Sequence, residues 1–273
     1  MQRSQQVMGT VVSYSLREAE SATDAAGDVP AQVAAANATA AHTAAEAALE
    51  RAEAKLRWVD DVFSTYKPES PVSRLRRGEI ELDAAPPEVA EVLELCRKAR
   101  EVSEGWFDPW SLPGGLDPTG LVKGWAAERA LDELKNAGVP AALINAGGDI
   151  AAYGRPAPGQ PWRIGIRHPL AEDRLLLMVE LDGSGAIATS GTYERGEHLI
   201  DPHTGAPAHA LLSATVVGLD LAFADALATA LYVSGGALLE RISRLAGYHG
   251  FTVSGDGVVR ASRGLPVALK IAA

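Results

Sequence analysis

Residues 224–231 read Ala-Asp-Ala-Leu-Ala-Thr-Ala-Leu, a run of small residues and leucine that predicts the first two turns of a helix. No proline or glycine follows until Gly235, so the sequence contains no earlier helix end. Asp225 and Thr229 stand four residues apart and therefore project from one helix face. A carboxylate and a hydroxyl oxygen together provide half of an oxygen-only site for a hard cation such as Mg²⁺. The same pair is also compatible with an ordinary helix start, where Asp225 lies near the positive end of the helix dipole.

The elements on either side of this helix indicate an α+β (mixed α/β) fold. Turns separate most of the predicted strands and helices occur at intervals, unlike the regular alternation of a doubly wound sheet. No Walker A sequence and no GxGxxG motif after a strand are present. The composition and periodicity predict helices over 31–62, 86–105 and 122–137, and strands over 7–16, 141–145, 162–167, 175–181, 213–218, 251–253 and 258–260.

The composition limits the classes of function. The 273 residues, 47% of them hydrophobic, suffice for one large domain or two closely packed halves. A net charge of −10 without a large Lys/Arg cluster argues against nucleic-acid binding. The single cysteine, Cys96, excludes an intramolecular disulfide and a cysteine-based zinc site, and its helical context predicts a core residue. No transmembrane segment and no leader are recognisable, so we expect a cytoplasmic protein, or an exported one if a leader has been removed.

Two loop segments carry residues that suit a phosphate-containing or planar ligand. Asp117-Pro118-Thr119-Gly120 precedes the helix predicted to start at about Val122, where free backbone N–H groups can face phosphate and Lys123 adds positive charge. Lys123 is equally compatible with a solvated lysine at a helix start. Tyr66 lies in a polar loop rich in proline and serine, and its ring can stack on a planar ligand or cover the edge of the core.

The order of the motifs resembles that of the ApbE-type FAD:protein FMN transferases, also called flavin transferases. The resemblance extends from residue 8 to about residue 235. It rests on Met8-Gly9-Thr10, Phe63-Ser64-Thr65-Tyr66 with Ser70 and Arg74-Leu75, Phe107-Asp108-Pro109, Asp117 to Lys123-Gly124, Asn145-Ala146-Gly147-Gly148-Asp149, Ser190-Gly191-Thr192-Tyr193-Glu194-Arg195, His198 to Asp201-Pro202-His203-Thr204-Gly205, and Ala224-Asp225 to Thr229.

The resemblance implies a single ApbE-like domain over residues 1–273, with two closely packed α+β halves around a mostly antiparallel sheet. It also implies an enzyme that binds FAD as substrate together with Mg²⁺. Such an enzyme transfers FMN to a threonine or serine hydroxyl of an acceptor flavoprotein and releases AMP.

The same resemblance assigns site residues. The metal ligands correspond to Asp225, Thr229 and Gly120, of which the glycine can offer only its carbonyl, while a further acidic contact of some members falls at Ala228. The flavin contacts correspond to Met8, Tyr66, Trp106, Phe107, Asp108, Asp117, Lys123 and Ile200. The chain departs from the family between Phe107-Asp108-Pro109 and Asp117, where members usually carry a much longer segment.

The residues also suggest how the transfer proceeds. Asp225 would hold the Mg²⁺ that neutralises the diphosphate and Lys123 would add positive charge, because phosphoryl-type transfer needs mainly positioning and charge. His198 titrates near neutrality and is the candidate that removes the acceptor proton, although a histidine hydrogen-bonded to a neighbour is an equal alternative. Asp201 is a second candidate base, or a residue that caps its own turn. Two other functions stay open: an Mg²⁺-dependent hydrolase that cleaves FAD to FMN and AMP, and a non-catalytic FAD-binding protein.

Overall fold

A large antiparallel sheet forms the centre of the computed structural model, which describes residues 1–17, 31–191 and 199–270. Its strands are β1 (Gln2–Val7), β2 (Thr10–Arg17), β3 (Ala141–Ala146), β4 (Asp149–Gly154), β7 (Gly183–Gly191), β8 (Leu211–Gly218), β9 (His249–Ser254) and β10 (Val259–Ala261). They lie in the spatial order β1-β2-β3-β4-β7-β8-β9-β10, and each neighbouring pair is antiparallel.

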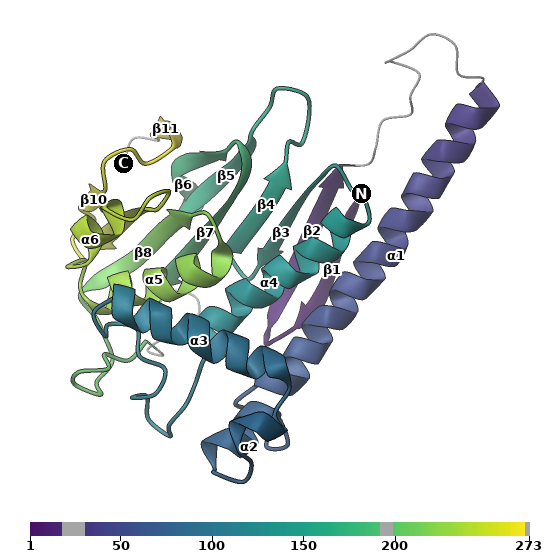
Figure 1. Cartoon of the computed structure of the whole chain (residues 1–273). Helices are drawn as coiled ribbons and strands as arrows, with labels where there is room; N and C mark the ends of the chain where they lie inside the picture. Colours follow the sequence, from purple (N-terminus) through teal and green to yellow (C-terminus); the bar gives the residue numbers. More distant parts are fainter. Residues whose placement is uncertain (18–30, 192–198, 271–273) are drawn as a thin grey trace.

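Helices cover one face of this sheet, and a smaller sheet packs on part of the other (Figure 1). The helices are α1 (Ala31–Phe63), α2 (Pro71–Arg76), α3 (Pro87–Val102), α4 (Thr119–Asn136), α5 (Leu221–Val233) and α6 (Leu239–Ser243), with a 3₁₀ turn, η2, at Leu82–Ala84. The smaller sheet has the order β11-β6-β5 and consists of β5 (Trp162–His168), β6 (Ala171–Leu181) and β11 (Val267–Lys270).

The alternation of side chains along the central strands explains the two layers. In β7, Ala186 and Ala188 face the helices, whereas Ile187 between them faces the smaller sheet. Small residues on the helix side allow α4 and α5 to approach the sheet closely. Larger side chains such as Phe251, which is fully buried, fill the space between the two sheets.

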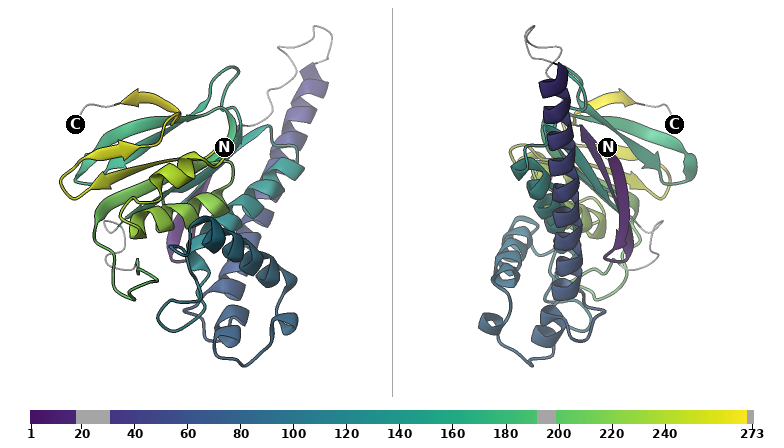
Figure 2. Two further views of the ribbon diagram at one scale, coloured as in Figure 1. Left: turned by 60° about the vertical axis from the view of Figure 1, so that its left-hand side comes forward. Right: turned by 90° about the vertical axis from the view of Figure 1, so that its right-hand side faces the viewer.

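The long helix α1 confirms the helix predicted over 31–62. Its buried residues, among them Ala45, Leu49, Ala52, Leu56 and Val59, recur at helical spacing and face the core. The N-terminal part of the helix extends beyond the sheet (Figure 2). In the described part of the chain, no helix has the length and apolarity needed to cross a membrane.

The predicted α+β fold with a mostly antiparallel sheet is confirmed, and so is the burial of Cys96. The single strand predicted over 7–16 is wrong: Met8 and Gly9 form a turn between β1 and β2. Both residues have a positive φ, of 53° and 69°, which the run of β-branched residues around them does not reveal. The structure also adds β4, β7 and β11, for which the sequence analysis predicted no strand.

Candidate functional site

Helices α4 and α5 bring the predicted metal-binding residues together. A Cβ atom built on Gly120, in the first turn of α4, would lie 3.8 Å from Oγ1 of Thr229 on α5. It would also lie 3.2 Å from Cε2 of Phe107, so a side chain at residue 120 would crowd that ring. Helix α4 begins at Thr119, three residues earlier than predicted, and Gly120 therefore lies within the helix and not in a turn before it. Its carbonyl has a second lone pair beyond the helical hydrogen bond.

Asp225 lies one turn before Thr229 on α5, and its side chain is buried with 4% exposure. The Thr229 hydroxyl lies 3.2 Å from the Ser190 hydroxyl at the end of β7. The α5 face directed toward Gly120 and the end of β7 therefore carries a buried carboxylate and a hydroxyl. Helix α5 is the helix that the sequence predicted for both residues, and that prediction is confirmed.

The donor atoms of this cluster suit a hard cation. They are oxygens of a carboxylate, a hydroxyl and a backbone carbonyl, and Mg²⁺ in proteins is commonly bound by one or two carboxylates together with substrate phosphates. Within residues 1–17, 31–191 and 199–270, no group of three His, Cys, Asp or Glu side chains could hold a metal ion, so a cation here would also need the hydroxyl and carbonyl oxygens. A buried carboxylate is also favoured by a neighbouring cation. The residues present therefore fit Mg²⁺.

Lys123 forms an ion pair with Asp149 at the same end of the sheet. Asp149 is 1% exposed, and its other carboxylate oxygen accepts a hydrogen bond of 3.0 Å from the backbone N–H of Thr189. The turn before Asp149 has a tight approach at Gly147, where φ is +63° and an added Cβ would lie 2.3 Å from Oγ1 of Thr10. Only glycine fits this turn, which fixes Asp149 beneath the Lys123 ammonium group.

The two carboxylates predicted to contact the flavin have partners within the protein. Asp117 accepts hydrogen bonds from the backbone N–H and the hydroxyl of Thr119, at 3.0 and 2.6 Å, and so caps the start of α4. Asp108 accepts from Nε of Arg100 at 2.7 Å and from the backbone N–H of Trp110 at 3.0 Å. These contacts fix the segment that leads into Gly120.

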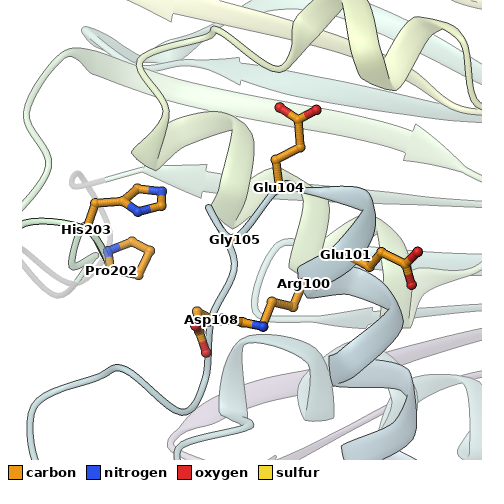
Figure 3. A pocket seen from close by; sticks show the side chains of 7 residues that line it. All are labelled: Arg100, Glu101, Glu104, Gly105, Asp108, Pro202 and His203. Carbon is orange, nitrogen blue, oxygen red and sulfur yellow. Dashed lines mark hydrogen bonds and ion pairs between the residues drawn. The ribbon is translucent and has the colours of Figure 1, made fainter.

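A cavity of about 330 Å³ lies beside this segment (Figure 3). Pro202 and His203 line it together with Gly105 and Asp108, and Arg100, Glu101 and Glu104 complete its wall. The Trp106 and His203 rings pack nearly perpendicular to each other, with 4.6 Å between the ring centroids. Phe107, the next residue, is buried and lies against Gly120, so the segment that lines the cavity also contacts the α4–α5 cluster.

The remaining predicted residues lie in loops and turns. Met8 is in the β1–β2 turn, and Ile200 forms an isolated bridge with Pro207. The side chain of Tyr66 is 93% exposed, so it does not cover the edge of the core. Asp201 accepts a hydrogen bond of 2.8 Å from the backbone N–H of His203, as expected for a residue that caps its own turn. His198 lies outside the described residues.

Three residues near the site were not predicted as site residues. Asp149, Ser190 and His203 all lie within motifs that the sequence analysis quoted, but a Gly-Gly-Asp or Ser-Gly sequence by itself does not reveal a partner. Asp149 could have been found, because a lone aspartate after paired glycines at the start of a buried strand needs a cationic or N–H partner.

Curated proteins named FAD:protein FMN transferase match part of this chain. The protein from Vibrio cholerae is 36% identical over 129 residues, which cover 44% of this chain and 39% of the relative. The protein from Salmonella typhimurium is 32% identical over 152 residues, which cover 52% of this chain and 43% of the relative. The matched region thus spans about two fifths of the length of these two relatives.

Solved structures resemble the fold over nearly its whole length. The ApbE protein of Thermotoga maritima superposes with a TM-score of 0.75 at 23% identity and covers 96% of this chain and 97% of its own. The flavinyl transferase ApbE of Pseudomonas stutzeri superposes with a TM-score of 0.73 at 25% identity and covers 96% of this chain and 94% of its own. A sequence model of the ApbE family matches residues 8–115 and 111–249, most of the chain. The chain therefore belongs to the ApbE family.

Proposed function

We propose that this chain is an Mg²⁺-dependent FAD:protein FMN transferase that modifies a threonine or serine of an acceptor flavoprotein and releases AMP. Family membership and the names of the curated relatives support the transferase class. The observation that carries the proposal is the approach of Gly120 to Thr229, one turn from the buried carboxylate of Asp225. We further infer that residues 1–273 act as one domain.

Asp225, Thr229 and the Gly120 carbonyl would hold Mg²⁺, which when bound supplies positive charge to the diphosphate of FAD. Ala228 offers no ligand atom in its side chain, so the site has a single acidic ligand. The Ser190 hydroxyl, 3.2 Å from that of Thr229, orients the threonine oxygen. In the first turn of α4, Asp117 accepts the N–H of Thr119 and the Pro118 carbonyl accepts those of Leu121 and Val122, so the backbone donor proposed for a phosphate oxygen is the N–H of Gly120.

In the proposed reaction, the acceptor hydroxyl oxygen forms a bond to the phosphorus of the FMN half. The bond from that phosphorus to the oxygen of the AMP phosphate breaks, and AMP leaves with the bonding electrons. The hydroxyl proton passes to a base, for which His198 is the candidate. Lys123, oriented by Asp149, contributes positive charge beside the diphosphate.

Replacing Asp225 by alanine tests the proposal. We expect the variant to fold, because alanine suits a helix, but to lose more than about 99% of FMN transfer, as removal of a metal ligand predicts. The measurement is the mass of an acceptor flavoprotein after incubation with FAD and Mg²⁺, which should increase by one FMN in the wild type only. Asp182→Ala, which removes an exposed carboxylate paired with Arg155, is the matched control.

Two results would contradict the proposal. An Asp225→Ala variant that labels the acceptor at the wild-type rate would exclude the metal assignment. Rapid AMP release by the wild type without any acceptor, and no mass increase with one, would instead identify a flavin pyrophosphatase.

A further inference from the structure

Three residues of α4, spaced one turn apart, face α5. Gly120 lies beside Thr229, as described above. Gly124 lies against the first turn of α5, where an added Cβ would be 2.4 Å from the carbonyl oxygen of Leu221 and 2.9 Å from the nitrogen of Ala222. Glu128, one turn further, accepts a hydrogen bond of 2.5 Å from the backbone N–H of Leu221. The same helix face thus contacts both the first turn of α5 and the turn with Thr229.

The N–H groups of the first turn of a helix have no partner within that helix. In α5, Asp220 accepts from the N–H of Phe223 at 2.8 Å, and the Tyr248 hydroxyl in turn donates to Asp220. The N–H of Leu221 is bonded instead by Glu128, a residue of another helix. Leu221 and Ala222 are buried, so removing this acceptor would leave a polar group unsatisfied.

We propose that Glu128 is a positioning residue: its side-chain oxygen fixes the first turn of α5 against α4 and so sets where Asp225 and Thr229 lie relative to Gly120. Glu128 bonds to Leu221, one turn before Asp225, and acts on the three residues through the helix. The effect on Mg²⁺ rests on the proposed function, whereas the effect on the first turn of α5 does not.

The experiment combines hydrogen exchange with Mg²⁺ binding. Glu128→Ala removes the acceptor, Glu128→Gln keeps a carbonyl oxygen at the same distance, and Asp132→Ala removes an exposed carboxylate of the same helix that pairs with Arg129. We expect Glu128→Ala to speed exchange of the Leu221 and Ala222 amides roughly tenfold, as loss of a buried hydrogen bond predicts. Titration calorimetry with MgCl₂ should show about tenfold weaker binding, as for other residues that orient metal ligands. Glu128→Gln and Asp132→Ala should match the wild type in both measurements.

Unchanged exchange of the two amides in Glu128→Ala would overturn the inference. It would also be overturned if Glu128→Gln lost Mg²⁺ affinity as fully as Glu128→Ala, since charge and not the hydrogen bond would then be responsible. If the wild type binds no Mg²⁺ but Glu128→Ala still exchanges faster, the proposed function would be refuted. The role of Glu128 in fixing the first turn of α5 would still stand. If the alanine variant does not fold, Glu128→Met fills a similar volume without an oxygen acceptor and gives the same test.

Discussion

At the scale of single residues, the Lys123–Asp149 pair determines the charge at the candidate site. Asp149 is almost fully buried, whereas the Lys123 side chain is 23% exposed. The Asp149 carboxylate therefore depends on Lys123 for a charge partner more than Lys123 depends on Asp149. Removing the lysine would leave a buried carboxylate without its cation. Removing both would leave no buried charge at this pair, so the protein should fold but lack the positive charge that the proposed reaction requires.

The structure therefore predicts that a variant lacking both charges recovers stability without recovering activity. Lys123→Met should destabilise the fold by about 3 kcal/mol, the cost of breaking a buried ion pair from one side. Lys123→Met/Asp149→Asn should recover most of that stability, because no buried charge remains, and yet not recover FMN transfer. Urea unfolding and the acceptor mass assay measure the two effects, and a double variant as unstable as the single one would contradict the prediction.

At the scale of secondary-structure elements, the site depends on how closely α4 and α5 approach. Gly124 permits this approach, because the backbone of Leu221 and Ala222 occupies the space that a side chain would need. Backbone atoms cannot move away as the end of a flexible side chain can. A methyl group at this position must separate the two helices.

We expect Gly124→Ala to destabilise the protein by about 2 kcal/mol, a typical cost of overpacking, although alanine favours helices. It should also weaken Mg²⁺ binding, because the distance between Gly120 and Thr229 would increase. Gly255→Ala is the control, since an added Cβ there meets no atom within 4 Å. Thermal unfolding and Mg²⁺ titration measure these two effects. Equal results for Gly124→Ala and Gly255→Ala would contradict the prediction.

The elements themselves were largely predictable from the sequence. Helix α1 followed from its composition, and most strands followed from their apolar runs, whereas β4, β7 and β11 were not predicted. The β1–β2 turn was missed because Met8 adopts a positive φ that its side chain does not favour. Contacts between elements were not predictable in the same way: the motif order indicated Gly120, Asp225 and Thr229, but the fit of Gly124 against Leu221 depends on a packing distance that no local pattern encodes.

At the scale of the whole molecule, pH acts on stability through Glu128. Burial raises the pKa of Glu128 to about 7, and Asp220 adds to the rise, while the N–H of Leu221 and Arg129 oppose it. In the unfolded chain the pKa is 4.5. The native state therefore binds the proton more tightly, and this contribution to stability is complete below pH 4.5 and lost as the pH rises through about 7.

Glu128→Gln does not titrate, so its free energy of unfolding relative to the wild type should increase between pH 4.5 and about 7 and then level off. Urea unfolding at a series of pH values measures this difference. Glu94→Gln, which replaces an exposed carboxylate on α3, should show no such trend. Parallel pH profiles for Glu128→Gln and the wild type would contradict the prediction.

The candidate site and the loop between β4 and β5 lie at opposite ends of strand β4. Asp149 begins β4 at one end, and Gly154 ends it at the other, where the chain continues into residues 155–161 (Figure 1). Pro158 and Gly159 are exposed, and nothing lies within 4 Å of a Cβ added to Gly159. A tether attached at this loop would immobilise the protein on a sensor surface and leave the candidate site open to the acceptor protein that the proposed function requires.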